Sequence, residues 1–205
     1  MNLKNFLVLF MFLSIPIYLY SQEPNPAKMQ YDRAIEAAVS GDWSQAKSYF
    51  HRTLDIDSLY VPARLNMTVL DDVDSLLLDS LAVIHYFKGI EYGNMDKIPE
   101  KIEELNQAIL ISPDFGLAYN ERGIAWTKML EYEEAVANYD KALLYLPESP
   151  EIFFNKALSC DNLEAYETAA LAYQKFLDYT PQDYLWYIIY ARKRIYEITE
   201  ENKQK

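Results

Sequence analysis

The sequence has little cysteine, histidine or glycine, and each shortage excludes a class of protein. Cys160 is the single cysteine among 205 residues, so an intramolecular disulfide and a cysteine-based zinc site are both excluded. The two histidines, His51 and His85, belong to no H-E-x-x-H motif and to no plausible Ser/His/Asp arrangement. Five glycines are few for a chain of short strands joined by tight turns, and no glycine-rich phosphate loop occurs. We expect Cys160 to be a small buried hydrophobic residue.

Positive charge is also in short supply. The chain has 19 Lys and Arg against 31 Asp and Glu, which gives a formal net charge of −12. Such an acidic body repels phosphate backbones, so nucleic acid is excluded as a partner. Hydrophobic residues make up 51% of the chain, which is enough to build a core and argues against disorder.

Long apolar runs are absent except at the N-terminus. Phe6 to Tyr20 is almost free of polar residues, Lys4 precedes it, and Ser21 follows it. This is the pattern of a secretory signal peptide, and the run of about 15 residues falls short of the ~20 that span a bilayer. Leu19 stands where a small residue is usual before a cleavage site, so an uncleaved N-terminal anchor remains the alternative. We expect residues 1–21 to be removed on export and residues 22–26 to form a linker.

What the chain has instead is a repeat of 34 residues, most legible from Gly116 to Ser149. Small, aromatic and proline residues recur at this spacing, in the pairs Tyr119 and Phe153, Gly123 and Ala157, Ala135 and Ala169, Tyr139 and Tyr173, and Pro147 and Pro181. A fixed period of this length is typical of stacked repeats, in which each unit buries its apolar face against its neighbours. Small residues allow two helices to cross closely, and the prolines end the second helix of each unit.

The period divides the chain. A degenerate first repeat covers residues 27–60, further repeats cover 82–115, 116–149 and 150–183, and 184–205 holds a capping helix and a tail. Residues 61–81 form an insert that breaks the period, in which Pro62 can open a short helix through about Leu70. The acidic segment DDVDSLLLDS within it lacks the Gly and Glu that an EF-hand loop needs, so we interpret it as a solvated turn in which Asp74 or Ser75 caps the next helix.

The repeat resembles the tetratricopeptide repeat (TPR), and specifically TPR proteins of an exported bacterial type. The pattern of that family is W-x₂-L-G-x₂-Y, then A-x₃-F, then P. The chain has matching residues in the same order, namely Tyr119, Arg122, Gly123, Trp126, Ala135, Tyr139 and Pro147. The resemblance covers about residues 27 to 199. It implies an all-α superhelical solenoid of helix-turn-helix repeats with a C-terminal capping helix.

In the TPR family the first helix of each repeat lines a concave groove. The groove positions that the resemblance assigns here are Tyr86, Ile90, Asn94, Asn120, Ile124, Thr127, Lys128, Phe154, Leu158, Asp161 and Asn162. One TPR subgroup grips a C-terminal carboxylate with Lys and Asn at such positions, but Tyr86 and Ile90 occupy two of them here. The mixture of aromatic, aliphatic and amide side chains favours an extended segment or an amphipathic helix as ligand. Any one of these residues could instead be covered by a neighbouring helix.

A basic residue recurs where the family pattern has Leu, at Lys88, Arg122 and Lys156. These side chains could form a basic edge that receives acidic groups of a partner. Alternatively, their stems pack on apolar surface and their charged heads lie near carboxylates of the preceding repeat.

Three function classes follow from these patterns. We expect a non-enzymatic protein–protein interaction scaffold of the cell envelope or exported space, with a protein or peptide partner. Neither a cofactor, a metal nor a small-molecule substrate is expected, and membrane attachment is expected only if the N-terminal segment is uncleaved. The alternatives are a self-associating structural or regulatory envelope component and an enzyme, although the abundant carboxylates are typical of solvated helix surfaces.

Overall fold

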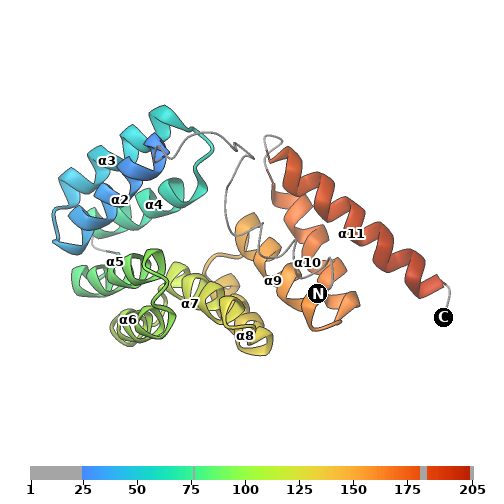
Figure 1. Ribbon diagram of the computed structural model, residues 1–205. Coiled ribbons are helices and arrows are strands. Elements are labelled where there is room, and N and C mark those ends of the chain that lie inside the picture. Colours follow the sequence, from blue (N-terminus) through green and yellow to red (C-terminus); the bar gives the residue numbers. More distant parts are fainter. Residues whose placement is uncertain (1–24, 76, 181–183, 204–205) are drawn as a thin grey trace.

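The computed structural model describes residues 25–75, 77–180 and 184–203, with side chains through residue 200. Within these residues the chain forms ten helices and no strand (Figure 1). The helices are α2 (Pro26–Val39), α3 (Trp43–Ile56), α4 (Val61–Asp74), α5 (Ser80–Asn94), α6 (Ile98–Ile111), α7 (Gly116–Lys128), α8 (Tyr132–Tyr145), α9 (Pro150–Asn162), α10 (Tyr166–Tyr179) and α11 (Leu185–Lys203). The fold is an all-α solenoid, as the sequence predicts.

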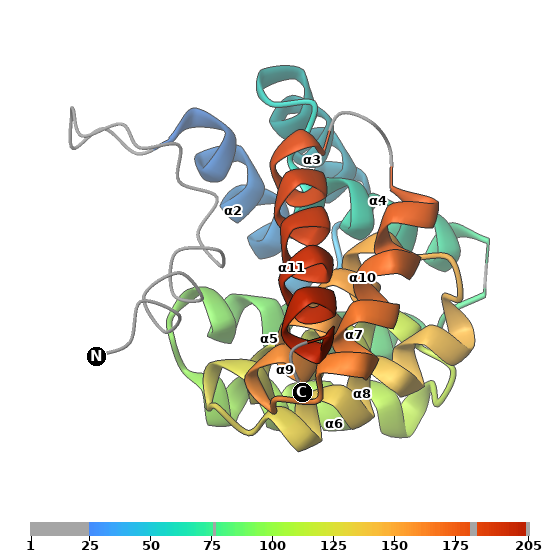
Figure 2. The ribbon, with the colours of Figure 1, turned by 90° about the vertical axis from the view of Figure 1, so that its right-hand side faces the viewer.

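Four helix pairs, α2–α3, α5–α6, α7–α8 and α9–α10, make up most of the solenoid. Each pair packs along its length, and neighbouring pairs stack through α6 on α7 and α8 on α9. The second helices of the last three pairs begin at Ile98, Tyr132 and Tyr166, which are 34 residues apart. Figure 2 looks onto α11, which packs on α10 and ends the array.

The helices begin where short polar side chains can cap them. The Asn25 Oδ1 accepts from the Ala27 N–H at 2.9 Å, and the Asp42 Oδ1 accepts from the Gln45 N–H at 2.9 Å. At the start of α5 the cap is Asp79, whose carboxylate accepts from the Leu81 N–H at 2.7 Å. These caps satisfy backbone donors that a helix leaves without partners in its first turn.

The insert contains a longer helix than the sequence predicts. Helix α4 continues past Leu70 to Asp74, so Asp74 and Ser75 end one helix and do not cap the next. The prediction of a cap at Asp74 or Ser75 is therefore wrong, because the chain needs five more residues to turn toward α5. Lys47 from α3 binds the acidic end of α4, with Nζ 2.6 Å from Asp71 Oδ1 and 2.7 Å from Asp74 Oδ2. No group of His, Cys, Asp and Glu in the described part of the chain could hold a metal ion.

The core runs between the paired helices. Gly123 lies at a tight crossing of α7 and α8, where an added Cβ would stand 2.6 Å from Cε1 of the fully buried Tyr139. Cys160 is buried, and burial raises the pKa of its thiol, so the reactive thiolate is disfavoured. Lys101, where the family pattern has Ala, is 6% exposed and places its Nζ 2.5 Å from Glu121 Oε2.

The recurring basic residues pair within the solenoid. Lys156 on α9 binds Asp140 on α8 of the preceding repeat, with Nζ 2.5 Å from Oδ1. Arg122 donates to the side-chain oxygens of Asn106 and Asn138, each at 2.7 Å. These contacts favour the second interpretation of the recurring positive charge, because two of the three heads are already bound.

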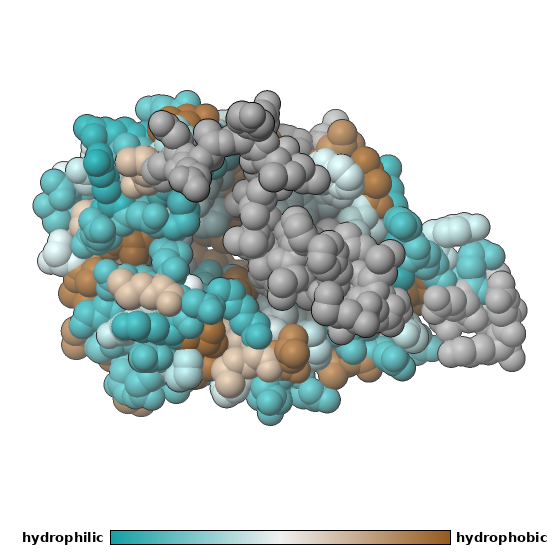
Figure 3. Space-filling model, viewed as in Figure 1, coloured by the Kyte–Doolittle hydropathy of each residue, from teal (hydrophilic) through white to brown (hydrophobic). Residues whose placement is uncertain are grey.

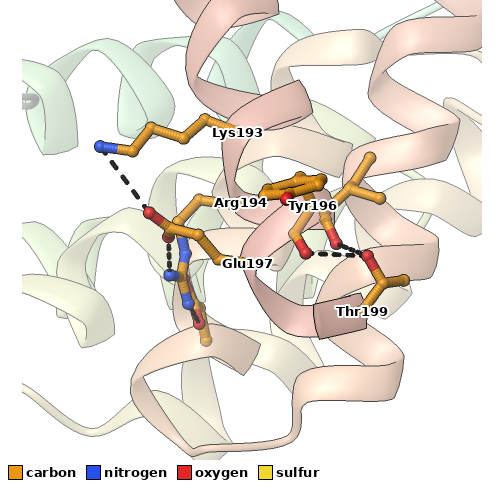
Figure 4. A network of polar contacts seen from close by, with 7 residues as sticks. Lys193, Arg194, Tyr196, Glu197 and Thr199 are labelled. Carbon is orange, nitrogen blue, oxygen red and sulfur yellow. Dashed lines mark hydrogen bonds and ion pairs between the residues drawn. The ribbon is translucent and has the colours of Figure 1, made fainter. Parts of the chain in front are cut away.

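An ion-pair network fastens α11 to α9 (Figure 4). The guanidinium of Arg194 holds both oxygens of Asp161, with Nη2–Oδ1 at 2.6 Å and Nε–Oδ2 at 2.7 Å, and its Nη1 contacts Glu197. Lys193 reaches Glu197 from the solvent side at 3.7 Å. The Asp161 and Arg194 side chains are only 12% and 11% exposed, so this two-pronged contact fixes the position of the cap.

The predicted signal segment, residues 1–21, lies outside the described residues. None of the described helices combines the length and the apolar character that crossing a membrane requires.

Candidate functional site

The concave side of the array holds a cavity of about 450 Å³, which we call the central pocket. Its walls come from the two ends of the fold and its floor from the middle. In Figure 1, α2 and α4 lie on one side of this concavity and α9 to α11 on the other. On the face that Figure 3 displays, hydrophobic surface occurs in separate patches between hydrophilic stretches.

The N-terminal wall is made by α2, the α3–α4 loop and the start of α4. Its lining residues are Tyr31, Asp57, Leu59, Tyr60, Val61, Pro62, Leu65 and Asn66. The ring centroids of Tyr31 and Tyr60 are 5.2 Å apart, which gives this wall a continuous aromatic face. Four of the lining residues belong to the insert, so the segment that interrupts the repeats supplies half of this wall.

The floor comes from the first helices of the three regular repeats. Its lining residues are Tyr86 on α5, Asn120, Glu121 and Ile124 on α7, and Glu151, Phe154, Asn155 and Leu158 on α9. A buried polar chain crosses from floor to wall, in which the Tyr86 hydroxyl donates to Asn66 Oδ1 at 2.8 Å and Asn66 Nδ2 donates to the Tyr31 hydroxyl at 3.0 Å. This chain ties α5, α4 and α2 together and fixes the two tyrosine rings.

The C-terminal wall is formed by the start of α11 together with Phe176 of α10. The residues Tyr184, Leu185, Trp186 and Tyr187 line it. Trp186 is 82% exposed and Leu185 is 62% exposed, so large apolar groups stand open to solvent at the rim. Exposed aromatic residues beside a concave site are typical of contact surfaces for partners.

A direct contact joins the two walls. The guanidinium of Arg64 on α4 hydrogen-bonds the Tyr184 hydroxyl and lies 5.3 Å from the centroid of the same ring. The Tyr184 hydroxyl in turn donates to Glu151 Oε1 at 3.1 Å. The chain thus closes one side of the central pocket by a contact between residues that are 120 positions apart.

The lining is acidic. Asp57, Glu121 and Glu151 line the central pocket, and no Lys, Arg or His does so among the residues that the structure describes. Burial raises the pKa of Tyr31 and of Tyr86 well above the ordinary value, and the negative charge of Glu121 raises both further. Both tyrosine side chains are therefore neutral hydrogen-bonding groups at neutral pH.

Five of the eleven residues that the resemblance assigns to a groove line this pocket. They are Tyr86, Asn120, Ile124, Phe154 and Leu158. The other six, Ile90, Asn94, Thr127, Lys128, Asp161 and Asn162, lie outside it.

The six residues outside the pocket are occupied within the fold. Thr127 is 3% exposed, and its Oγ1 lies 3.0 Å from both the Gly123 carbonyl oxygen and the Tyr139 hydroxyl. Asp161 holds Arg194 as described above, and Ile90 is a core residue, 6% exposed. The remaining three make polar contacts elsewhere, Asn94 with Asp32 at 3.4 Å, Lys128 with Asp96 at 3.9 Å and Asn162 with its own helix at Leu158.

Phe154 needs a correction of its own. It lines the pocket, but it is only 5% exposed and packs edge-on against Tyr187 and Tyr173, at centroid distances of 5.1 and 5.9 Å. Helix α11 folds over the last repeat and covers the face on which Phe154 stands. The residue therefore belongs to the core as well as to the pocket.

Sequence reasoning missed both walls. Residues of α2, α4 and the start of α11 do not fall on the groove positions of a regular repeat, since α4 interrupts the period and α11 has no partner helix. The pairing of Tyr31 with Tyr184 across the pocket had no signal in the spacing. Only the density of aromatic residues at 184–187 hinted that this stretch had a role beyond capping.

Comparison with protein-family models gives no match, and comparison with curated proteins gives none either. Solved structures do match. The first TPR of Spaghetti (RPAP3), bound to HSP90 peptide SRMEEVD, superposes with a TM-score of 0.55 at 16% identity, over 62% of this chain and 97% of that one. The fold is a tetratricopeptide-repeat fold.

Two other TPR structures extend the likeness. The TPR2AB domain of yeast Sti1 covers 84% of this chain and 69% of its own at a TM-score of 0.54 and 16% identity. The Sgt2 TPR domain from Aspergillus fumigatus covers 62% of this chain and 82% of its own at 0.52 and 14%. At these identities the likeness concerns the TPR fold alone.

Proposed function

We propose that the protein is a non-enzymatic interaction module that holds a segment of a partner protein in the central pocket. The observation that carries this proposal is the pocket itself, which has an aromatic floor, exposed apolar groups at its rim and side-chain amides within it. Amides that can grip a peptide backbone, beside apolar walls that can take its side chains, suit an extended segment.

The structural neighbours support this reading by analogy. The RPAP3 and Sti1 TPR domains are described as complexes with HSP90 or its peptide. This chain has the same fold and offers its own cavity on the concave side. The lining residues differ in kind from a carboxylate clamp, so the analogy extends to the mode of binding and not to the ligand.

We place the protein in the exported space, periplasmic or secreted, because residues 4–21 have the pattern of a signal peptide. If that segment is retained, the module is tethered to the membrane instead. Intact mass of the protein recovered from its native cell decides between the two, since cleavage removes the mass of residues 1–21.

Self-association through the terminal cap is the second candidate. On α11, Ile189 and Tyr196 are 51% and 66% exposed, away from the pocket lining. A second copy could cover these side chains. Sedimentation of the full chain over a range of concentrations tests this candidate, and a mass that stays monomeric counts against it.

The main proposal is tested by selecting binders from a displayed library of random peptides with the full chain. We expect Trp186→Ala to weaken binding of the selected peptides at least tenfold, about 1.4 kcal/mol, because an exposed aromatic at a pocket rim often dominates an interface. Tyr196→Ala is the matched control, since Tyr196 is a largely exposed aromatic on the same helix outside the lining. Equal binding by both variants would contradict the proposal.

A further inference from the structure

We propose that the segment held in the central pocket carries a lysine or arginine side chain, received by the carboxylates of Asp57 and Glu151 among the pocket tyrosines. This inference rests on the proposed function and specifies the chemistry of its ligand. It is argued from three features of the lining, namely its charge, its aromatic rings and the partners of its carboxylates.

Two of the three lining carboxylates have no positive partner. Glu121 is bound by Lys101, whereas neither Asp57 nor Glu151 forms an ion pair within the described residues. Asp57 Oδ1 accepts from the Leu59 N–H at 3.0 Å, and Glu151 accepts from the hydroxyls of Ser149 and Tyr184, both at 3.1 Å. All of these donors are neutral. A cation entering the pocket would therefore meet two uncompensated negative charges.

The rings around these carboxylates suit a cation as well. Tyr31, Tyr60, Tyr86, Tyr184, Trp186 and Tyr187 all line the pocket. The face of an aromatic ring attracts a guanidinium or ammonium within about 6 Å, most strongly at Trp. The fold already uses this attraction at the rim, where Arg64 lies 5.3 Å from the Tyr184 ring centroid. A ligand arginine would meet the same chemistry deeper in the pocket.

The charge of the lining also works against acidic ligands. The HSP90 peptide bound by the RPAP3 domain, SRMEEVD, has two Glu and one Asp. Here an acidic segment would face Asp57, Glu121 and Glu151 without a lining cation among the described residues. Like charges across an interface disfavour the wrong partner, so the pocket discriminates by charge in the opposite sense.

The first experiment uses the composition of the peptides that the full chain selects from the random displayed library. Enrichment in Lys and Arg, in peptides whose binding Trp186→Ala weakens, supports the inference. Peptides that depend on Trp186 but are neutral or acidic overturn it and leave the proposed function standing. Failure to select any peptide that depends on Trp186 sinks the proposed function itself, and the inference with it.

The second experiment removes the charge while keeping the hydrogen-bond acceptors. We expect the double variant Asp57→Asn with Glu151→Gln to bind the selected basic peptide at least tenfold more weakly, and the original protein to lose affinity with added salt. Asp114→Asn with Glu148→Gln is the matched control, because both residues are exposed in the equivalent loops before α7 and α9 and outside the lining. Equal affinity of both double variants for the peptide, at unchanged helicity, overturns the inference.

A second copy of the chain is the competing occupant. If it filled the pocket, sedimentation would show a concentration-dependent dimer that Trp186→Ala abolishes, and this result would overturn the inference. A monomer at all concentrations, together with peptide binding that depends on Trp186, supports it.

Discussion

Three residues without glycine's freedom adopt left-handed backbone, and they do so at a fixed interval. Asp96, Leu130 and Glu164 have φ of 58°, 65° and 58°, each in the turn between the two helices of a repeat. In the first pair the same turn holds Gly41, with φ of 79°. The turn geometry of the repeat thus requires a positive φ, and three of the four repeats meet it with a side chain that costs about 1–2 kcal/mol.

Leu130→Gly should therefore stabilise the protein by about 0.5–1 kcal/mol, the relief of backbone strain less the extra entropy of an unfolded glycine. The Leu130 side chain is 67% exposed, so little packing is lost. Chemical denaturation measures the change. Leu144→Gly is the control, since Leu144 is 69% exposed but lies within α8, where glycine costs about 1 kcal/mol. A shift of the same sign in both variants would contradict the argument.

At the same scale, spacing predicted some residues well and others poorly. Gly123 was expected at a close helix crossing, and the structure puts Tyr139 against the space where its side chain would be. Thr127 and Asp161 were expected to face a ligand and are bound inside the fold. A repeat pattern determines which face of its own helix a residue occupies. It does not determine whether the next layer covers that face.

At the scale of elements, the two helices without a repeat partner matter most for the pocket. The sequence predicted a capping helix from residue 184 and a short helix in the insert, and α11 and α4 lie in those segments. Their contacts were not predictable, because neither segment shares the register that places a regular repeat against its neighbours. The contact of Arg64 with Tyr184 depends on the curvature accumulated over all the repeats between them.

We expect Arg194→Ala to loosen α11 selectively. Removing the guanidinium leaves the largely buried Asp161 carboxylate without its partner, which is a strongly destabilising change. Backbone amides of α11 should then exchange hydrogen at least tenfold faster, while those of α7 and α8 keep their rates. Lys193→Ala serves as the control, because the Lys193 side chain is 70% exposed and its ion pair with Glu197 is weak. Uniform acceleration over all helices would show that α11 does not move alone.

For the whole molecule, the buried tyrosines predict how stability depends on alkaline pH. Burial raises the pKa of Tyr31, Tyr86 and Tyr139 in the folded state, and it raises that of Tyr60 to about 12. Because the folded state keeps these protons longer, the stability they contribute is fully present below the unfolded pKa of about 10. It is lost as the pH rises from there toward the folded values.

The free energy of unfolding, measured by denaturant titration, should therefore decline as the pH is raised from about 10 to 12. Phenolate absorbance should rise in two phases, first from exposed tyrosines such as Tyr196 and then from buried ones as the helices unfold. A single phase, complete before any helicity is lost, would show that the buried rings ionise inside the folded protein.

The contact between Arg64 and Tyr184 also sets when the site comes into existence during synthesis. Tyr31 and Tyr60 leave the ribosome early, whereas the opposite wall waits for residues 184–187, close to the end of the chain. At about 5–20 residues per second this delay is roughly ten to thirty seconds. A nascent or prematurely terminated chain has one wall and part of the floor but no closed pocket. Ligand capture thus becomes a property of the finished polypeptide alone.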